Sequence, residues 1–396
     1  GKRVNEFPML EDQRFVLGQA LDLVRERGVD ALLLAGDLYD KSAPSAEAVS
    51  VLDWFLTSVA DRGIPCFAIP GNHDSAERVA YAAGPLSRQG IYVAPLFDGA
   101  VAHFTLEDEA GPVTFWLLPF LKPAQVRPHF PEAEIGSDYT AALKAVLDAC
   151  PLEESERNVL LCHQFVTAGG AEPERCDSEL SIGGLDNVDA SAFDRFDYVA
   201  LGHIHRPQRI GRDAVRYAGS LLKYSASEVD HAKRVTLGAK DTDGCRISFE
   251  AVPIEPLHDM RRIKGPLDEL IGTDVVDAAD AEDYLHVTLT DGQPIIDALA
   301  RLRAVYPNVM SLEYERTRPD DGAADTAPDI AVERLDPTDL FARFYEERTG
   351  AKLSEEQERI AFKALRAQME RGSQDEGERA PPIVAPSPAE SEGGIR

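Results

Sequence analysis

Short, wholly apolar segments that alternate with helical patterns limit what the first half of this chain can fold into. Residues 31–35 (ALLLA) and 65–69 (PCFAI) are two such segments, and an amphipathic helix carrying Val49 to Val59 separates them. Strands without polar residues are typical of a sheet that is covered on both faces. A strand, a helix and a strand joined by short connections favour parallel pairing. We therefore expect a layered α/β core flanked by helices.

The second half of the chain differs from the first in composition and in the order of its expected elements. Beyond Pro253 to Pro256, a strand, a helix and a strand follow one another closely and predict a small α+β domain at 254–318. The segment at 319–334 is acidic and rich in Ala and Pro, which is typical of a linker. Two helices are expected within 335–371, and disorder is expected at 372–396. The other expected elements are strands at 159–162, 198–201, 284–289 and 309–314, a helix at 295–305, and a hairpin of 101–106 with 113–118 turning at Gly111-Pro112.

Composition bears on the cellular compartment and on the kinds of partner that the chain can bind. The five cysteines are scattered without a CxxC pair, which favours a reducing cytoplasm over a disulfide framework or a zinc ribbon. No uncharged apolar run approaches the roughly 20 residues needed to cross a bilayer. The formal net charge of −28 opposes binding to phosphate backbones at long range. Bound divalent cations or a basic partner could offset this charge, so the acidity neither excludes nor supports a nucleic-acid substrate.

Metal-capable side chains directly follow four of the apolar strands. The clusters are Gly36-Asp37, Gly71-Asn72-His73-Asp74, His163-Gln164-Phe165 and Gly202-His203-Ile204-His205. Ligands of layered α/β proteins bind at the carboxyl ends of strands, so the four clusters can converge on one crevice. Carboxylate, amide oxygen and imidazole, without thiolate, form a ligand set that hard or borderline divalent cations prefer.

Each cluster alone also has a plainer interpretation. Gly, Asn and Asp are turn formers, and a single histidine at a strand end is commonly a core or surface residue. Four clusters in this order, each after a buried strand, are difficult to explain by turns. The sequence therefore predicts one shared metal site.

This series of motifs resembles that of the calcineurin-like metallophosphoesterases. The resemblance implies a layered β-sandwich core and a site for two divalent metal ions, usually Mn²⁺, with Mg²⁺ as the alternative. By this likeness Asp37 would bridge both ions. Asn72, His163 and His203 would bind the second ion, and His205 would bind the first. His73 would be the catalytic residue that contacts the phosphate, and two such ions could activate a water for in-line displacement.

The series normally opens with an Asp-x-His motif after the first strand, and no such motif precedes Asp37 here. The phosphoesterase domain expected at 1–253 would then lack its first strand and two ligands of the first ion. We therefore expect this chain to hold the first ion poorly, to show at most one manganese site on titration, and to be impaired as an enzyme.

Residues 186–202 and 217–225 further resemble one branch of the family, the SbcD nuclease subunits, and the likeness extends to about Met369. It implies that the 254–318 domain is a cap that helps to hold and open DNA ends. The implied activities are ATP-gated 3′-to-5′ exonuclease cleavage of double strands and endonuclease cleavage of single strands and hairpins. The implied setting is DNA repair, recombination and replication.

A short apolar stripe in the C-terminal segment has two interpretations. The stripe consists of Leu340, Phe341, Phe344 and Tyr345. It could pack on its own domain. The resemblance implies instead that it lies in a groove at the base of the coiled coil of an SbcC-type ATPase, within a heterotetramer that contains two copies of this chain.

Two other functions stay open at the level of the sequence. A stand-alone phosphodiesterase or phosphatase would share the metal site but give no role to the cap or the terminal helices. A catalytically silent scaffold would account for the missing Asp-x-His motif.

Overall fold

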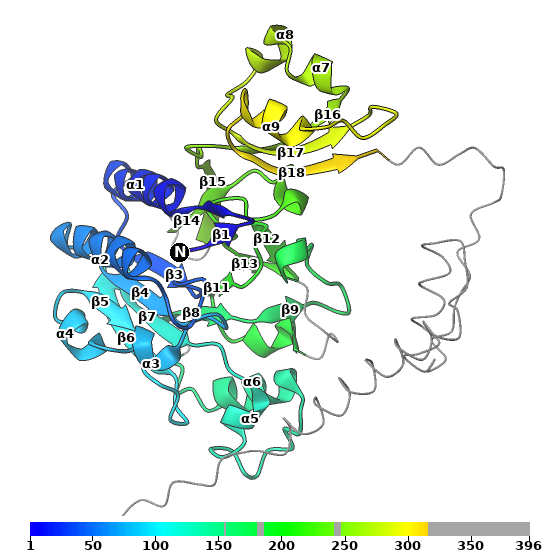
Figure 1. The fold of residues 1–396 in the computed structure, drawn as a ribbon. Helices are drawn as coiled ribbons and strands as arrows, with labels where there is room; N and C mark the ends of the chain where they lie inside the picture. Colours follow the sequence, from blue (N-terminus) through cyan, green and yellow to red (C-terminus); the bar gives the residue numbers. More distant parts are fainter. Residues whose placement is uncertain (154–155, 180–185, 241–246, 316–396) are drawn as a thin grey trace, which may run out of the picture. The chain divides into compact units, whose positions relative to one another are not determined.

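The computed structural model describes residues 1–153, 156–179, 186–240 and 247–315 (Figure 1). These residues lie in the compact unit Gly1–Thr317. The linker, the helix pair at 335–371 with Leu340, Phe341, Phe344 and Tyr345, and the C-terminal tail fall outside the described residues. Within the described part of the chain, no helix combines the length and the apolar character needed to cross a bilayer.

Two sheets face each other and form the layered core. The smaller sheet is parallel throughout and has the order β3-β4-β5. The larger has the order β12-β13-β11-β8-β7-β6, with antiparallel pairs only at its two edges. The strands are β3 (Leu32–Ala35), β4 (Cys66–Ile69), β5 (Ile91–Val93), β6 (Ala102–Asp108), β7 (Gly111–Leu118), β8 (Arg157–His163), β11 (Tyr198–Gly202), β12 (Gln208–Ile210) and β13 (Arg212–Tyr217).

Apolar side chains fill the space between the two sheets. Phe67 of β4 stacks on Phe115 of β7 with ring centroids 4.1 Å apart. Leu161 of β8 belongs to the same buried cluster. Strand β4 is buried throughout, as its all-apolar sequence indicates, whereas β3 is only half-buried because it lies at the edge of the smaller sheet. The layered α/β core is confirmed.

Helices cover the outer faces of both sheets. Helices α1 (Leu10–Glu26) and α2 (Ala46–Asp61) pack on the smaller sheet through Leu21, Phe55 and Val59. Helix α6 (Tyr139–Asp148) packs on the larger sheet. Ser45 starts α2 by accepting a hydrogen bond from the Ala48 amide. The shorter helices are α3 (Ala76–Val79), α4 (Ala83–Ser87) and α5 (Pro123–Val126).

A separate three-stranded sheet follows in the chain. Strands β16 (Met260–Gly265), β17 (Tyr284–Leu289) and β18 (Val309–Tyr314) pair in parallel, and α9 (Ala298–Arg303) packs on them. The predicted β-α-β unit is therefore present. The prediction missed β16 and the short helices α7 (Leu267–Leu270) and α8 (Thr273–Val276).

The remaining described strands form small pairs. The pairs are β1 (Arg3–Val4) with β2 (Phe7–Pro8), β9 (Phe165–Thr167) with β10 (Asn187–Asp189), and β14 (Arg234–Lys240) with β15 (Ile247–Pro253). The predicted hairpin at 101–118 is β6 with β7, but its turn lies at Glu109-Ala110 because Gly111 and Pro112 already belong to β7.

Candidate metal centre

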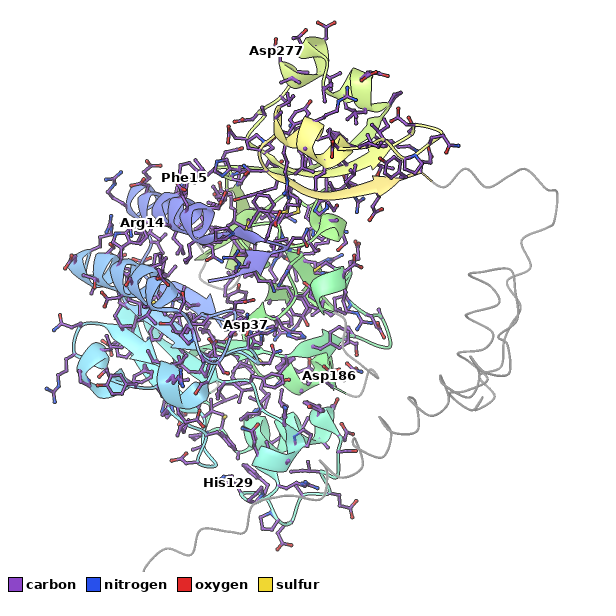
Figure 2. The ribbon with its side chains drawn as sticks, in the orientation of Figure 1. Arg14, Phe15, Asp37, His129, Asp186 and Asp277 are labelled. Carbon is purple, nitrogen blue, oxygen red and sulfur yellow. The ribbon has the colours of Figure 1, made fainter. Side chains whose placement is uncertain are left out.

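Strand register brings the predicted clusters to one end of the two sheets. In the smaller sheet Ala35 pairs with Ile69, so the loops that begin at Gly36 and Pro70 leave side by side. In the larger sheet Gly202 pairs with His163. Asp37, at the end of β3, is labelled in Figure 2.

Polar atoms of four predicted ligands meet at this end. His163 Nε2 lies 3.0 Å from Asn72 Oδ1 and 3.3 Å from Asp37 Oδ2. His203 Nδ1 lies 3.1 Å from the same Asn72 oxygen. The rings of His163 and His203 stand edge to face, 5.3 Å between centroids. Asp37, Asn72, His163 and His203 therefore form one compact group.

The proton on His163 decides what this group can hold. Its Nδ1 lies 2.7 Å from the carbonyl oxygen of Ala35, and a carbonyl can only accept, so Nδ1 is the donor. In the neutral ring Nε2 then offers a lone pair toward the oxygens of Asn72 and Asp37. In that form three acceptors face one another, and the donor set of carboxylate, amide and imidazole suits a divalent cation.

Two glycines leave the space that the site needs. A Cβ on Gly71 would lie 2.2 Å from Asp37 Oδ1. A Cβ on Gly202 would lie 1.7 Å from the Ala35 carbonyl oxygen and 2.7 Å from His163 Nδ1. Any side chain at either position would displace a predicted ligand or the carbonyl that orients it.

Two of the predicted ligands have backbone conformations that are unfavourable for non-glycine residues. Asp37 has a φ of 50° and His203 a φ of 97°. Such conformations cost about 1–3 kcal/mol each and persist where surrounding structure enforces them, commonly at functional sites. The chain therefore holds both side chains in place at the expense of local strain.

The charges at the site match a cation site. Although burial alone would raise it, the hydrogen bond and charge of His163 lower the pKa of Asp37 to about 2. Burial, with the nearby charge of His163, lowers the pKa of His203 to about 4. At neutral pH Asp37 is therefore an anion and His203 a neutral imidazole, the forms in which these groups bind metals.

His73 and Asp74 lie beside the group rather than within it. The His73 amide donates to Asp37 Oδ1 at 3.0 Å, and its exposed ring places Nδ1 3.0 Å from the Asp40 carbonyl oxygen. Asp74 accepts hydrogen bonds from the amides of Leu38, Tyr39 and Gly71 at 2.9–3.0 Å. Asp74 thus ties the loop after β3 to the loop after β4.

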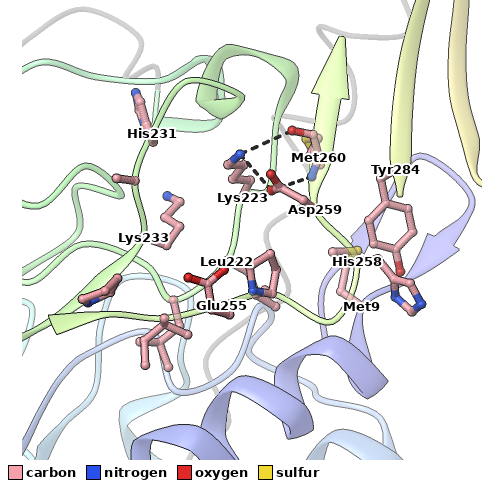
Figure 3. Close-up of a pocket in the computed structure, with 15 residues that line it drawn as sticks. Met9, Leu222, Lys223, His231, Lys233, Glu255, His258, Asp259, Met260 and Tyr284 are labelled. Atoms are coloured by element: carbon pink, nitrogen blue, oxygen red, sulfur yellow. Dashed lines mark hydrogen bonds and ion pairs between the residues drawn. The ribbon is translucent and has the colours of Figure 1, made fainter. Parts of the chain in front are cut away.

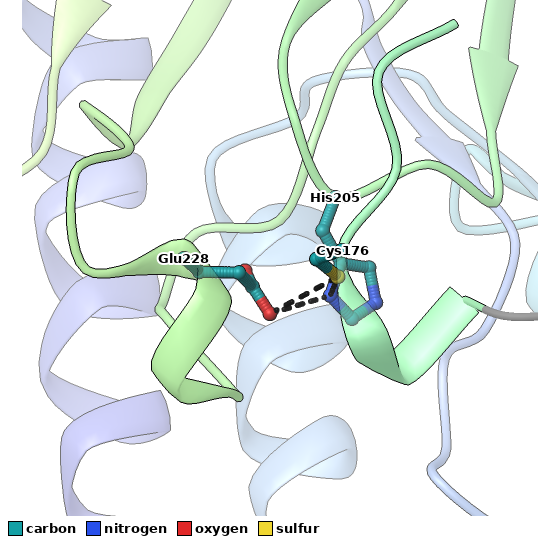
Figure 4. A group of neighbouring side chains, drawn as sticks. All are labelled: Cys176, His205 and Glu228. Atoms are coloured by element: carbon teal, nitrogen blue, oxygen red, sulfur yellow. Dashed lines mark hydrogen bonds and ion pairs between the residues drawn. The ribbon is translucent and has the colours of Figure 1, made fainter. Parts of the chain in front are cut away.

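His205 has different neighbours from the other four predicted ligands. It is two residues from His203 along the chain. Its Nδ1, however, lies 3.1 Å from Glu228 Oε1 and 3.7 Å from Cys176 Sγ (Figure 4). The structure therefore brings four of the five predicted ligands into direct contact and sets His205 into an adjoining buried cluster.

Known protein families match both the phosphoesterase region and the C-terminal region of the chain. The calcineurin-like phosphoesterase family model matches residues 11–207. A second model, described as the type 5 capsule protein repressor C-terminal domain, matches residues 256–349. The SbcD subunit of the nuclease SbcCD from Staphylococcus epidermidis is 29% identical over 366 residues, which cover 90% of this chain and 93% of that protein. The chain belongs to the SbcD family of calcineurin-like phosphoesterases.

Solved structures also resemble this SbcD family member. A crystal structure of a Thermus thermophilus protein shares 14% identity and a TM-score of 0.33, covering 61% of this chain and 94% of that one. An archaeal phosphodiesterase shares 13% identity and a TM-score of 0.28, covering 61% of this chain and 95% of that one.

The sequence-based prediction missed the thiol and the three charged groups around His205 in this SbcD chain. They are Cys176, Glu179, Glu228 and Lys233, all buried. Although burial opposes it, hydrogen bonds and charge from His205 and Lys233 lower the pKa of Glu228 to about 2. No local pattern marks these residues, and the likeness noted at 217–225 stops three residues short of Glu228.

The SbcD chain also has a cavity of about 200 Å³, whose lining includes Lys233 of the His205 cluster (Figure 3). Its lining includes Met9, Leu222 and Tyr284, and Lys223 there pairs with Asp259 at 2.8 Å. None of the predicted metal ligands lines it, so the cavity is not the candidate site.

Proposed function

We propose that this SbcD family member hydrolyses phosphodiester bonds of DNA as the nuclease subunit of a complex with an SbcC-type ATPase. The observation that carries the proposal is the meeting of Asp37, Asn72 and His163, whose facing atoms can all bind a divalent cation when the His163 ring is neutral. Such a group suits a divalent cation. The similarity to a curated SbcCD nuclease subunit along 90% of the chain supports the choice of substrate.

The residue roles are those that the family resemblance implies, and the contacts among Asp37, Asn72, His163 and His203 support them. Asp37, Asn72, His163 and His203 would hold one divalent ion, and Asp37 with His205 would hold a second. Three imidazoles favour Mn²⁺ over Mg²⁺, which prefers an all-oxygen shell. Bound ions would supply Lewis-acid stabilisation of charge on the phosphate and activation of a water.

His73 would act on the substrate rather than on a metal. Its amide is fixed to Asp37 and its Nδ1 faces the Asp40 carbonyl, so the exposed ring presents Nε2 outward. In the protonated ring Nε2 can donate to a phosphate oxygen or to the leaving oxygen. We assign His73 this catalytic role.

The finer activities belong to the assembled complex. We infer ATP-gated 3′-to-5′ exonuclease cleavage of DNA ends and endonuclease cleavage of single strands and hairpins, in repair, recombination and replication. The 254–318 domain would cap the DNA, and Leu340, Phe341, Phe344 and Tyr345 would bind the ATPase. The match of a family model to residues 256–349 supports one continuous functional region there.

Parallel assays separate this function from a stand-alone phosphodiesterase. Hairpin DNA and bis(p-nitrophenyl) phosphate are offered to the chain with Mn²⁺, with and without the SbcC-type partner and ATP. The proposal expects partner- and ATP-dependent cleavage of the hairpin. Cleavage of the small ester alone, unchanged by the partner, would favour the stand-alone enzyme.

A further inference from the structure

Three buried charged side chains contact the amide, the carbonyl and the ring Nδ1 of His205. Glu179 accepts a hydrogen bond from the His205 amide. Lys233 Nζ donates to the His205 carbonyl oxygen at 3.1 Å. Glu228 Oε1 lies 3.1 Å from the ring Nδ1. The residue is therefore fixed in both its backbone and its ring.

Stability alone is a poor reason to bury such a set of charges. Glu228 is 0% exposed, Lys233 6% and Glu179 8%. Glu228 Oε2 and Lys233 Nζ form an ion pair of 2.6 Å. Replacing a buried ion pair with apolar residues of similar volume is often neutral or stabilising by about 1–4 kcal/mol. The arrangement points to a role for His205 that requires an exact ring orientation and proton position.

The hydrogen bonds at Glu228 place the proton on His205. Its Oε1 also accepts from the Tyr224 amide and from Ser225 Oγ, each at 3.2 Å. The ion pair with Lys233 keeps the carboxylate ionised, and an ionised carboxylate only accepts hydrogen bonds. Nδ1 of His205 must therefore be the donor, and in the neutral ring Nε2 carries the lone pair.

We propose that Glu228, neutralised by Lys233, is a positioning residue that fixes the Nδ1–H form of His205 and so presents Nε2 as a metal ligand. The inference rests on the proposed function, which assigns His205 to a metal ion. Metal-bound histidines commonly donate their other ring N–H to a carboxylate, which sets the ring orientation and raises ligand basicity.

The same atoms could instead bind a metal directly. Cys176 Sγ, His205 Nδ1 and Glu228 Oε1 lie within 4.8 Å of one another. The Lys233 ammonium, 2.6 Å from the other oxygen of Glu228, opposes a cation at this point. Direct binding is therefore the competing outcome that the experiment must distinguish.

Nitrogen-15 NMR of histidine-labelled protein without metal tests the proton position. The chain has 9 histidines, and His205→Ala identifies the signals of His205. We expect wild-type His205 to be protonated on Nδ1 at neutral pH and Glu228→Gln to lose this preference. Protonation on Nε2, or an unchanged preference in Glu228→Gln, would overturn the proposal.

A second pair of variants excludes a purely structural effect. Glu228→Leu combined with Lys233→Met replaces both charges with apolar groups of similar size, and urea unfolding checks that the fold is retained. We expect this double variant to lose the Nδ1–H preference as well. Glu250→Gln, which alters an exposed ion pair with Arg27, is the matched control and should resemble the wild type.

Zn²⁺ titration of the same samples reports which ring nitrogen binds. The proposal expects a shift of the Nε2 signal, with an affinity about 10–100-fold weaker in Glu228→Gln. A shift of Nδ1 that Cys176→Ser abolishes would overturn it in favour of direct binding. If neither nitrogen responds, the assignment of His205 to a metal fails, while the metal-free spectra still decide whether Glu228 sets the proton.

Discussion

His163 Nε2 lies 3.0 Å from Asn72 Oδ1, although His163 ends β8 of the larger sheet and Asn72 follows β4 of the smaller sheet. The Ala35 carbonyl holds the opposite nitrogen of the His163 ring at 2.7 Å. The smaller sheet thus supplies Asn72 and also the carbonyl that orients the histidine of the larger sheet. The metal site therefore depends on the packing of the two sheets.

Replacing His163 should remove activity without unfolding the protein. We expect His163→Ala to lower Mn²⁺-dependent hydrolysis of a small phosphodiester at least about 100-fold, because loss of a ligand should exceed the 10–100-fold effect of an outer-shell partner. His129→Ala, on an exposed histidine, is the control. Equal loss in both variants, or none in His163→Ala, would contradict the assigned role.

Gly202 should tolerate no side chain. The added Cβ of Gly202→Ala would lie 1.7 Å from the Ala35 oxygen, so we expect about 1–3 kcal/mol of lost stability and a displaced His163. Gly18→Ala is the matched control, because a Cβ on Gly18 in α1 meets no atom within 4 Å and alanine favours helix. The urea concentration at the midpoint of unfolding should fall for Gly202→Ala and rise for Gly18→Ala.

Asp74 should stabilise the loops after β3 and β4 without binding a metal ion itself. Asp74→Ala leaves the amides of Leu38, Tyr39 and Gly71 without their acceptor. We expect a loss of about 2 kcal/mol or more in unfolding free energy, together with reduced hydrolysis. A variant that unfolds like the wild type in urea would show that these hydrogen bonds contribute little.

The layered core and most of the site could be predicted from the sequence because their signals are local. The all-apolar strands at 31–35 and 65–69 indicate burial on both faces, and ligands follow them directly. Glu228 and Lys233 could not be predicted, since their contacts with His205 depend on how distant loops pack. Strand β16 was missed because its sequence, MRRIKG, is interrupted by basic residues and resembles a polar segment.

The stability of the folded chain should fall at alkaline pH. Burial raises the pKa of the Cys66 thiol to about 12, whereas an unfolded thiol ionises near pH 8.5. Between these values the unfolded chain has released a proton that the folded chain keeps, so stability falls as pH rises, by up to about 1.4 kcal/mol per pH unit. Cys66→Ala should flatten the dependence of unfolding free energy on pH above 9. An unchanged slope would show that Cys66 is not the group responsible.

Calorimetric titration with Mn²⁺ tests the central claim most directly. The wild type, Asn72→Ala, His163→Ala and the His129→Ala control are titrated under the same conditions at neutral pH. If Asp37, Asn72, His163 and His203 form a metal site, the wild type and the control bind Mn²⁺ alike. Binding should then be at least about 10-fold weaker in the other two variants. Equal Mn²⁺ affinity in all four proteins would contradict the account.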